Sequence, residues 1–281
     1  MIESRRDFLK TGCLAIAGAT AASSIGLTTP KESQASSAEL PFGWPSEGLN
    51  IEETKELAYT GYLGTSRFSG AAGPHCASAT FGAIVGQLQE VALIDPAFAP
   101  YNNIPLGMMK WGAGGIVGFA SLCGALNGAC AAIGLACGAH AKQYMANLLT
   151  WYSEAELPIY PGPDSDISHI TSTAGSNLCH VSVTNWCLES GYGSGSPERG
   201  QRCACLAADV AGKVVEMVNS GYPEELGNPR DNNTTCGSCH SAGKDFDGGQ
   251  FTRGKMDCNS CHVDIRKSSP EGHRFRGNKD K

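Results

Sequence analysis

Apolar positions in the chain after residue 38 recur mainly at helical spacing. Residues 75–91 form one such run, and residues 205–220 form another. One face of the second run is apolar and carries Leu206, Val210, Val214 and Met217. A period close to 3.6 residues predicts amphipathic helices. The fold class that we expect for residues 39–221 is therefore mainly α.

A stretch without any charged residue, 112–139, lies between these two runs. It is long enough to span a bilayer, but it consists mostly of Gly, Ala, Ser and Cys. Small residues repeat four positions apart at Gly114/Gly118, Gly124/Gly128 and Gly134/Gly138. Such spacing lets two backbones approach closely. We expect a soluble core helix that continues through His140 to Trp151, and no stable membrane span in the mature protein.

The last part of the chain, residues 222–281, has few large apolar side chains. A segment of this size and composition cannot fold around a core of its own. Residues 228–233 are rich in Asn and contain Pro, which is typical of a linker. The pattern predicts a small, loop-rich C-terminal module that follows the helical domain of residues 39–221.

The first 38 residues have the order of a signal peptide. A weakly apolar segment from about Cys13 to Leu27 is followed by the small residues Ser36-Ser37-Ala38. Before it lies Ser4-Arg5-Arg6-Asp7-Phe8-Leu9-Lys10, and paired arginines followed by Phe-Leu-Lys resemble the twin-arginine (Tat) class. We expect residues 1–38 to be removed on export to the periplasm; the alternative is an N-terminal membrane anchor.

Charge and cysteine content narrow the possible partners. The net charge is −6, and the sequence has neither a basic stripe nor a phosphate-binding Gly loop, which argues against nucleic acid as a partner. Thirteen cysteines are far more than a chain of this length usually has, so their spacing becomes informative.

Two copies of C-x-x-C-H lie in the C-terminal module. They are Cys236-Gly237-Ser238-Cys239-His240 and Cys258-Asn259-Ser260-Cys261-His262. This spacing lets two thiols add to the vinyl groups of one porphyrin, while the adjacent His becomes the proximal iron ligand. The motifs predict two covalent c-type haems, whose proximal ligands are His240 and His262.

A zinc ribbon is the alternative for the same residues, because the two Cys pairs also have the spacing C-x₂-C-x₁₈-C-x₂-C. Zinc does not require a His after each pair, and an exported chain meets the machinery that attaches haem. These two points favour haem.

Each haem needs a sixth ligand if it only carries electrons. The candidates, in order of preference, are His75, His140 and His169, from the same or a partner subunit, and His180 follows. For each histidine taken singly, a role at the surface or as a helix cap is the ordinary alternative.

Four further cysteines lie close together in the sequence, at Cys179, Cys187, Cys203 and Cys205. Four thiols at such spacing can bind an iron–sulfur cluster; disulfides and zinc are the alternatives. The Tat route exports folded proteins whose cofactor is inserted in the cytoplasm, whereas covalent haem is attached after export. The signal therefore favours a cluster. Cys130 and Cys137, by contrast, are expected to be small apolar core residues.

The helical part resembles the redox-active family named for its C_GCAxxG_C_C pattern. The resemblance rests on Cys76, on the run that begins Cys123-Gly124 and ends at Gly128, on Cys179, and on Cys203 or Cys205. It covers residues 75–220, and here Cys precedes Gly in the central run. Joined to two haem motifs, this domain resembles the split-Soret cytochromes c of anaerobic sulfate-reducing bacteria.

That resemblance implies a homodimer with two closely stacked, bis-His haems in each subunit and an iron–sulfur cluster in the helical domain. The family pattern points to the ligands Cys76, Cys123, Cys179 and Cys205. We prefer the set that is local in sequence, Cys179, Cys187, Cys203 and Cys205, because short loops bring four thiols together at a small entropic cost.

The function expected from these features is periplasmic electron transfer between redox partner proteins, in a setting of anaerobic respiration. An enzyme is the first alternative, a small haem reductase or peroxidase with an open axial site. A binding module organised by a zinc ribbon is the second.

Overall fold

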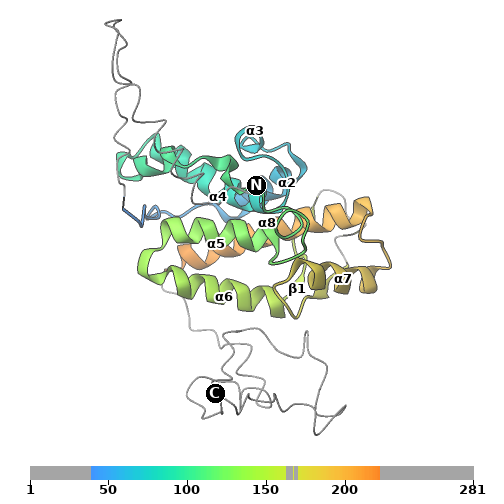
Figure 1. Ribbon diagram of the computed structural model, residues 1–281. Helices are drawn as coiled ribbons and strands as arrows, with labels where there is room; N and C mark the ends of the chain where they lie inside the picture. The colour runs from blue at the N-terminus through green and yellow to red at the C-terminus, as the bar shows by residue number, and fades with distance from the viewer. Residues whose placement is uncertain (1–38, 163–166, 168–169, 222–281) are drawn as a thin grey trace, which may run out of the picture. The chain divides into compact units, whose positions relative to one another are not determined.

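The computed structural model describes residues 39–162, 167 and 170–221. The predicted signal peptide (1–38) and the predicted haem module (222–281) lie outside these residues, as does His169. The described part is mainly helical, as predicted (Figure 1).

Seven α-helices, three 3₁₀ helices and two short strands make up the described part. The α-helices are α2 (Ile51–Leu63), α3 (Ser69–Ala72), α4 (Cys76–Ala92), α5 (Gly124–Ala136), α6 (Ala141–Glu154), α7 (Cys179–Ser190) and α8 (Pro197–Asn219). The 3₁₀ helices are η1 (Pro96–Asn103), η2 (Leu106–Met109) and η3 (Gly138–His140). The strands β1 (Glu156–Leu157) and β2 (Ser172–Thr173) pair antiparallel, with Glu156 opposite Thr173.

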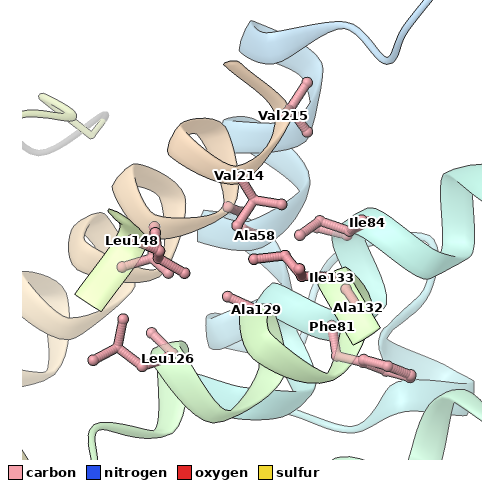
Figure 2. Close-up of a cluster of buried hydrophobic side chains, with 14 of the residues drawn as sticks. Ala58, Phe81, Ile84, Leu126, Ala129, Ala132, Ile133, Leu148, Val214 and Val215 are labelled. Atoms are coloured by element: carbon pink, nitrogen blue, oxygen red, sulfur yellow. The ribbon is translucent and has the colours of Figure 1, made fainter. Parts of the chain in front are cut away.

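Helix α8 lies at the centre of the packing and contacts α2, α4, α5 and α6. Figure 1 shows α5 and α6 running side by side with α8 against them. The core between these helices is formed by fully buried side chains such as Ile84, Leu126, Leu148 and Val214 (Figure 2). The apolar face predicted for residues 205–220 is the face that α8 turns into this core.

Small residues let α4 and α5 pack backbone to backbone. A Cβ atom added to Gly128 would lie 2.3 Å from the carbonyl oxygen of Ala77, which no real contact tolerates. The close approach predicted from the Gly124/Gly128 spacing is therefore confirmed. Cys130 and Cys137 pack against the same core as small apolar residues. Among the described residues, no helix is long and apolar enough to cross a membrane.

The continuous helix predicted from residue 112 to Trp151 is wrong in two places. Residues 112–122 form an irregular loop, and α5 and α6 are separated by η3. Glycine accounts for both breaks, because Gly114, Gly118 and Gly138 have positive φ angles (57°, 79° and 52°), which glycine adopts without steric cost. The small residues that suggested one long helix instead allow the chain to turn.

Helix α8 also begins earlier than predicted, at Pro197 instead of Cys205. The hydroxyl of Ser196 accepts a hydrogen bond from the N–H of Arg199, which caps the helix. Serine at the cap followed by proline is a strong start signal. As a result, Cys203 and Cys205 lie inside a helix rather than in a loop.

The side chain of Asp209 holds the segment that follows β1 against α8. Its carboxyl oxygens accept hydrogen bonds from the backbone N–H groups of Ile159 (2.7 Å) and Tyr160 (2.8 Å). Burial raises the pKa of this carboxyl to about 6, although the two N–H groups and the charges of Lys55 and Arg202 oppose the shift.

We expect Asp209→Asn to make the free energy of unfolding change more positively with pH between 3.8 and about 6. The folded carboxyl keeps its proton up to about pH 6, against 3.8 for its ordinary value. The folded state therefore binds more protons in this window, and the contribution of Asp209 to stability falls as the pH rises through it. Urea denaturation across the window measures the slope. Asp95→Asn is the control, because the exposed Asp95 caps η1 and Asn caps equally well. An unchanged slope in Asp209→Asn would contradict the assignment.

Candidate metal centre

Three cysteines stand at the N-terminal ends of three helices. Cys76 is the first residue of α4, Cys123 is the N-cap of α5, and Cys179 is the first residue of α7. The first N–H groups of a helix have no partner within it, and the helix dipole makes this end partly positive. A thiolate is therefore more stable here than elsewhere on a helix.

Backbone hydrogen bonds fix two of these helix ends beside each other. Leu122 and Leu178 form an isolated antiparallel bridge. On its two sides the N–H of Cys123 donates to the carbonyl of Asn177 (2.9 Å), and the N–H of Cys179 donates to that of Ser121 (2.7 Å). The bridge brings together residues that are more than fifty positions apart in the sequence.

Gly124 allows the third helix end to join them. A Cβ atom at this position would lie 2.6 Å from Cβ of Cys76 and 2.2 Å from the carbonyl oxygen of Gly112. That carbonyl accepts a hydrogen bond from the N–H of Ala77 (3.2 Å). Only a residue without a side chain fits, so the Cys123-Gly124 pair is what permits Cys76 to approach Cys123.

The fourth thiol comes from the second turn of α8. Cys203 is buried and lies near enough to Cys76, Cys123 and Cys179 to raise their pKa values. The four thiols thus converge from four different helices.

Burial keeps the thiols of Cys76, Cys123 and Cys179 protonated in the absence of a metal. It raises the pKa of Cys76 well above the ordinary value, raises that of Cys123, and raises that of Cys179 to about 12. Neighbouring thiols add to each shift, while the N–H groups of Gly114 and Ala125 favour the thiolates of Cys76 and Cys123. A bound metal would have to displace these protons.

Hydroxyl and guanidinium groups surround the thiols. Tyr62 hydrogen-bonds to Cys203, and Tyr152 to Cys123. Arg202, next to Cys203, is 2% exposed, and its Nη2 donates to Oγ of Ser182 (2.8 Å). The surroundings of the thiols are thus rich in donors and carry positive charge.

Comparison with known proteins places the chain in a family. Residues 75–217 match the family described as "Putative redox-active protein (C_GCAxxG_C_C)". The split-Soret cytochrome c of Desulfovibrio desulfuricans (strain ATCC 27774) is 32% identical over an alignment of 283 positions, which covers 92% of this chain and 94% of that protein. The chain belongs to the split-Soret cytochrome c family. A solved structure of the Desulfovibrio protein, described as having a novel iron centre, superposes with a TM-score of 0.65 at 31% identity, over 82% of this chain and 94% of that one.

Membership in the split-Soret family makes this chain a cytochrome c of the electron-transfer kind. The resemblance stated from the cysteine pattern is therefore confirmed, and so is the mainly helical fold. The haem cysteines Cys236, Cys239, Cys258 and Cys261 and the proximal ligands His240 and His262 lie outside the described residues. Their assignment stays a prediction from the motifs.

The thiols that converge differ from both sets named from the sequence. Cys179 and Cys203 belong to the group of four, but Cys187 follows Cys179 by eight residues on α7, a rise of about 12 Å. Cys205 is two residues from Cys203 on α8, which places it about 200° around the helix axis. It packs instead with Tyr59. The set from the family pattern shares three members with the converging group and has Cys205 where the structure has Cys203.

The helix that contains Cys203 and Cys205 explains this difference. In a loop, two thiols spaced by one residue can turn to the same side, and the entropic argument for the local set assumed such a loop. In a helix they cannot. The cap signal Ser196-Pro197 was the feature of the sequence that could have revealed this.

The candidate distal histidines within the described residues lie at the surface. His75, His140 and His180 are all exposed. His75 precedes Cys76 and has a positive φ angle (77°), and its ring packs edge-on against Tyr62, with centroids 5.8 Å apart. Two of these histidines, at 75 and 180, are thus direct sequence neighbours of converging thiols.

With the side chains in their present positions, the described residues contain no group of three or more His, Cys, Asp or Glu that could hold a single metal ion. The eight described cysteines are also free of disulfides.

Proposed function

We propose that this protein transfers electrons in the periplasm through two covalent c-type haems and an iron–sulfur cluster. The haems are attached at 236–240 and 258–262, and the cluster is held by Cys76, Cys123, Cys179 and Cys203. The observation that carries the cluster is the approach of three helix ends, which brings Cys76, Cys123 and Cys179 together. Cys203 of α8 lies near enough to raise the pKa values of all three.

The chemistry of the donor set suits a cluster. Thiolates are the usual ligands of iron–sulfur clusters, and a cluster binds them through different iron atoms. Its sulfur ligands can therefore lie further apart than the ligands of a single metal ion. When bound, such a cluster takes up and returns one electron.

The residues of this chain prepare the site for a negatively charged group. Three helix N-termini direct partial positive charge at the thiols. The N–H groups of Gly114 and Ala125 point to the sulfurs of Cys76 and Cys123, and Cys123 and Cys203 are buried. The iron centre described for the Desulfovibrio relative supports a metal at this domain.

The remaining parts of the proposal follow the sequence. Residues 1–38 act as a Tat signal, which would deliver the domain folded with its cluster. His75, His140 or His169 provide distal haem ligands, and the protein is a homodimer that exchanges electrons with redox partner proteins. A haem enzyme with an open axial site is the second candidate, and a zinc-ribbon module is the third.

A spectrum of the purified mature protein tests this function. We expect a pyridine haemochrome count of two haems c per chain, a Soret band with two components, and iron in excess of haem together with labile sulfide. Zinc without haem would establish the zinc-ribbon alternative. Stoichiometric binding of carbon monoxide to the reduced native protein would show an open axial site and favour the enzyme.

A further inference from the structure

Arg202 is a buried cation without a matching anion in the described part of the chain. The residue is 2% exposed, and the ion pairs found among the described residues do not include it. Its Nε is buried and has no hydrogen-bond partner there. Asp209 senses its charge, but the carboxyl oxygens of Asp209 already accept two backbone N–H groups.

A buried charge is costly unless something compensates it. Removing a guanidinium from water is unfavourable even after the protein relaxes. The groups that face Arg202 most strongly are Cys203, Tyr152 and Cys123. None of these carries a charge while protonated, whereas two of them become anionic as thiolates.

A hydrogen-bond chain links the guanidinium to the second thiol. Nη2 of Arg202 donates to Oγ of Ser182 (2.8 Å), and the hydroxyl of Tyr152 donates to the same oxygen (2.9 Å). The Tyr152 hydroxyl also lies within hydrogen-bonding reach of Cys123. Arg202 is thus held in one orientation, beside Cys203 and connected to Cys123.

We infer that Arg202 is a positioning residue that fixes a positive charge against the thiolates of Cys123 and Cys203 and thereby raises the reduction potential of the iron centre they hold. This inference rests on the proposed function. The reduced centre, which has gained one electron from a redox partner, carries one more negative charge than the oxidised centre. A fixed cation nearby stabilises the reduced form more than the oxidised form, and a dry site screens this effect little.

The test is a redox titration of the cluster in the full-length holoprotein, followed by electron paramagnetic resonance. Arg202→Gln removes the charge, Arg202→Lys keeps it, and Arg67→Gln removes a charge from an exposed arginine that pairs with Glu53 and Glu90. We expect Arg202→Gln to shift the redox equilibrium about tenfold or more towards the oxidised form, which is ~59 mV for one electron. Arg202→Lys should shift it less, and Arg67→Gln should leave it unchanged.

The inference would be overturned if the cluster of Arg202→Gln had the same reduction potential as the cluster of the Arg67→Gln control. If Arg202→Gln does not load iron, the potential of Arg202→Lys decides. A potential close to that of the wild type supports the inference, and a potential far below it, or iron loading lost in both variants, overturns it. Wild-type protein that contains only haem iron would end the proposed cluster, and this inference with it. The iron and sulfide count of the wild type separates that result from the others.

Thermal unfolding gives a second readout. In apoprotein the guanidinium lacks its anion, so Arg202→Met should leave the apo midpoint unchanged or raise it, while it lowers the holo midpoint. A purely structural arginine would lower both midpoints alike.

Discussion

Cys123→Ser is expected to eliminate the non-haem iron while leaving both haems attached. Cys123 holds a central place among the converging thiols, because the bridge at Leu122 fixes it beside Cys179, and Gly124 brings Cys76 against it. Serine has nearly the same shape, but its hydroxyl is a poor ligand for iron in a cluster. The measurement is non-haem iron and labile sulfide per haem, and the haem count serves as an internal reference.

Two further cysteines provide matched controls for this experiment. Cys205→Ser and Cys187→Ser change the same atom at thiols that lie away from the group, one beside Tyr59 and the other about two helical turns from Cys179. Both should keep the full content of iron and sulfide. Loss of iron in these two variants, with iron retained in Cys123→Ser, would establish the set that is local in sequence.

Helices of this fold could be predicted from the sequence where apolar residues recur on one face over several turns. The pattern over residues 75–91 gave α4 nearly to the residue, and the apolar positions from Leu206 to Met217 gave the buried face of α8. The prediction of one helix from the uncharged stretch at 112–139 was wrong, because Gly and Ala residues suit a tight loop as well as a helix. Only the surrounding packing decides between these, and it placed a loop before Cys123 and a break at Gly138.

The candidate site was harder to predict than the fold because its members are far apart in the chain. The entropic argument for a local set treats the chain as a flexible loop, but here folding has already fixed four helix positions for other reasons. Cys76 and Cys203 are brought together by the packing of α4 against α8. The sequence did contain one signal for the members of the site, a cysteine at the start of a helical run. This signal occurs at Cys76, Cys123 and Cys179.

The haem motifs are the opposite case. Each motif consists of five consecutive residues, so covalent haem at Cys236 and Cys258 can be predicted without knowledge of the fold, and it stays a prediction. Their distal ligands depend on tertiary or quaternary contacts. For that reason the sequence could rank His75, His140 and His169 without choosing between them.

Gly124→Ala is expected to weaken both the fold and the binding of iron. The new Cβ would meet the carbonyl oxygen of Gly112 at 2.2 Å and Cβ of Cys76 at 2.6 Å. The first is a backbone atom and the second is joined directly to the backbone, so α4 and α5 must move apart. Overpacking of this kind costs about 1–3 kcal/mol. Because Cys76 and Cys123 separate in the process, the non-haem iron per haem should fall as well.

Gly134→Ala is the control for this last prediction, since it makes the same change in the same helix. The nearest atom to its new Cβ is Cε of Met145, at 3.5 Å, which is an ordinary contact with a flexible side chain. Alanine in a helix interior is favoured over glycine by about 0.5–1 kcal/mol, so this variant should be slightly more stable and keep its iron. Denaturation midpoints and iron contents of the two variants are measured in parallel. The midpoint should fall in Gly124→Ala and rise slightly in Gly134→Ala, and only Gly124→Ala should lose iron. Equal behaviour of the two would mean that the approach of Cys76 to Cys123 does not depend on Gly124.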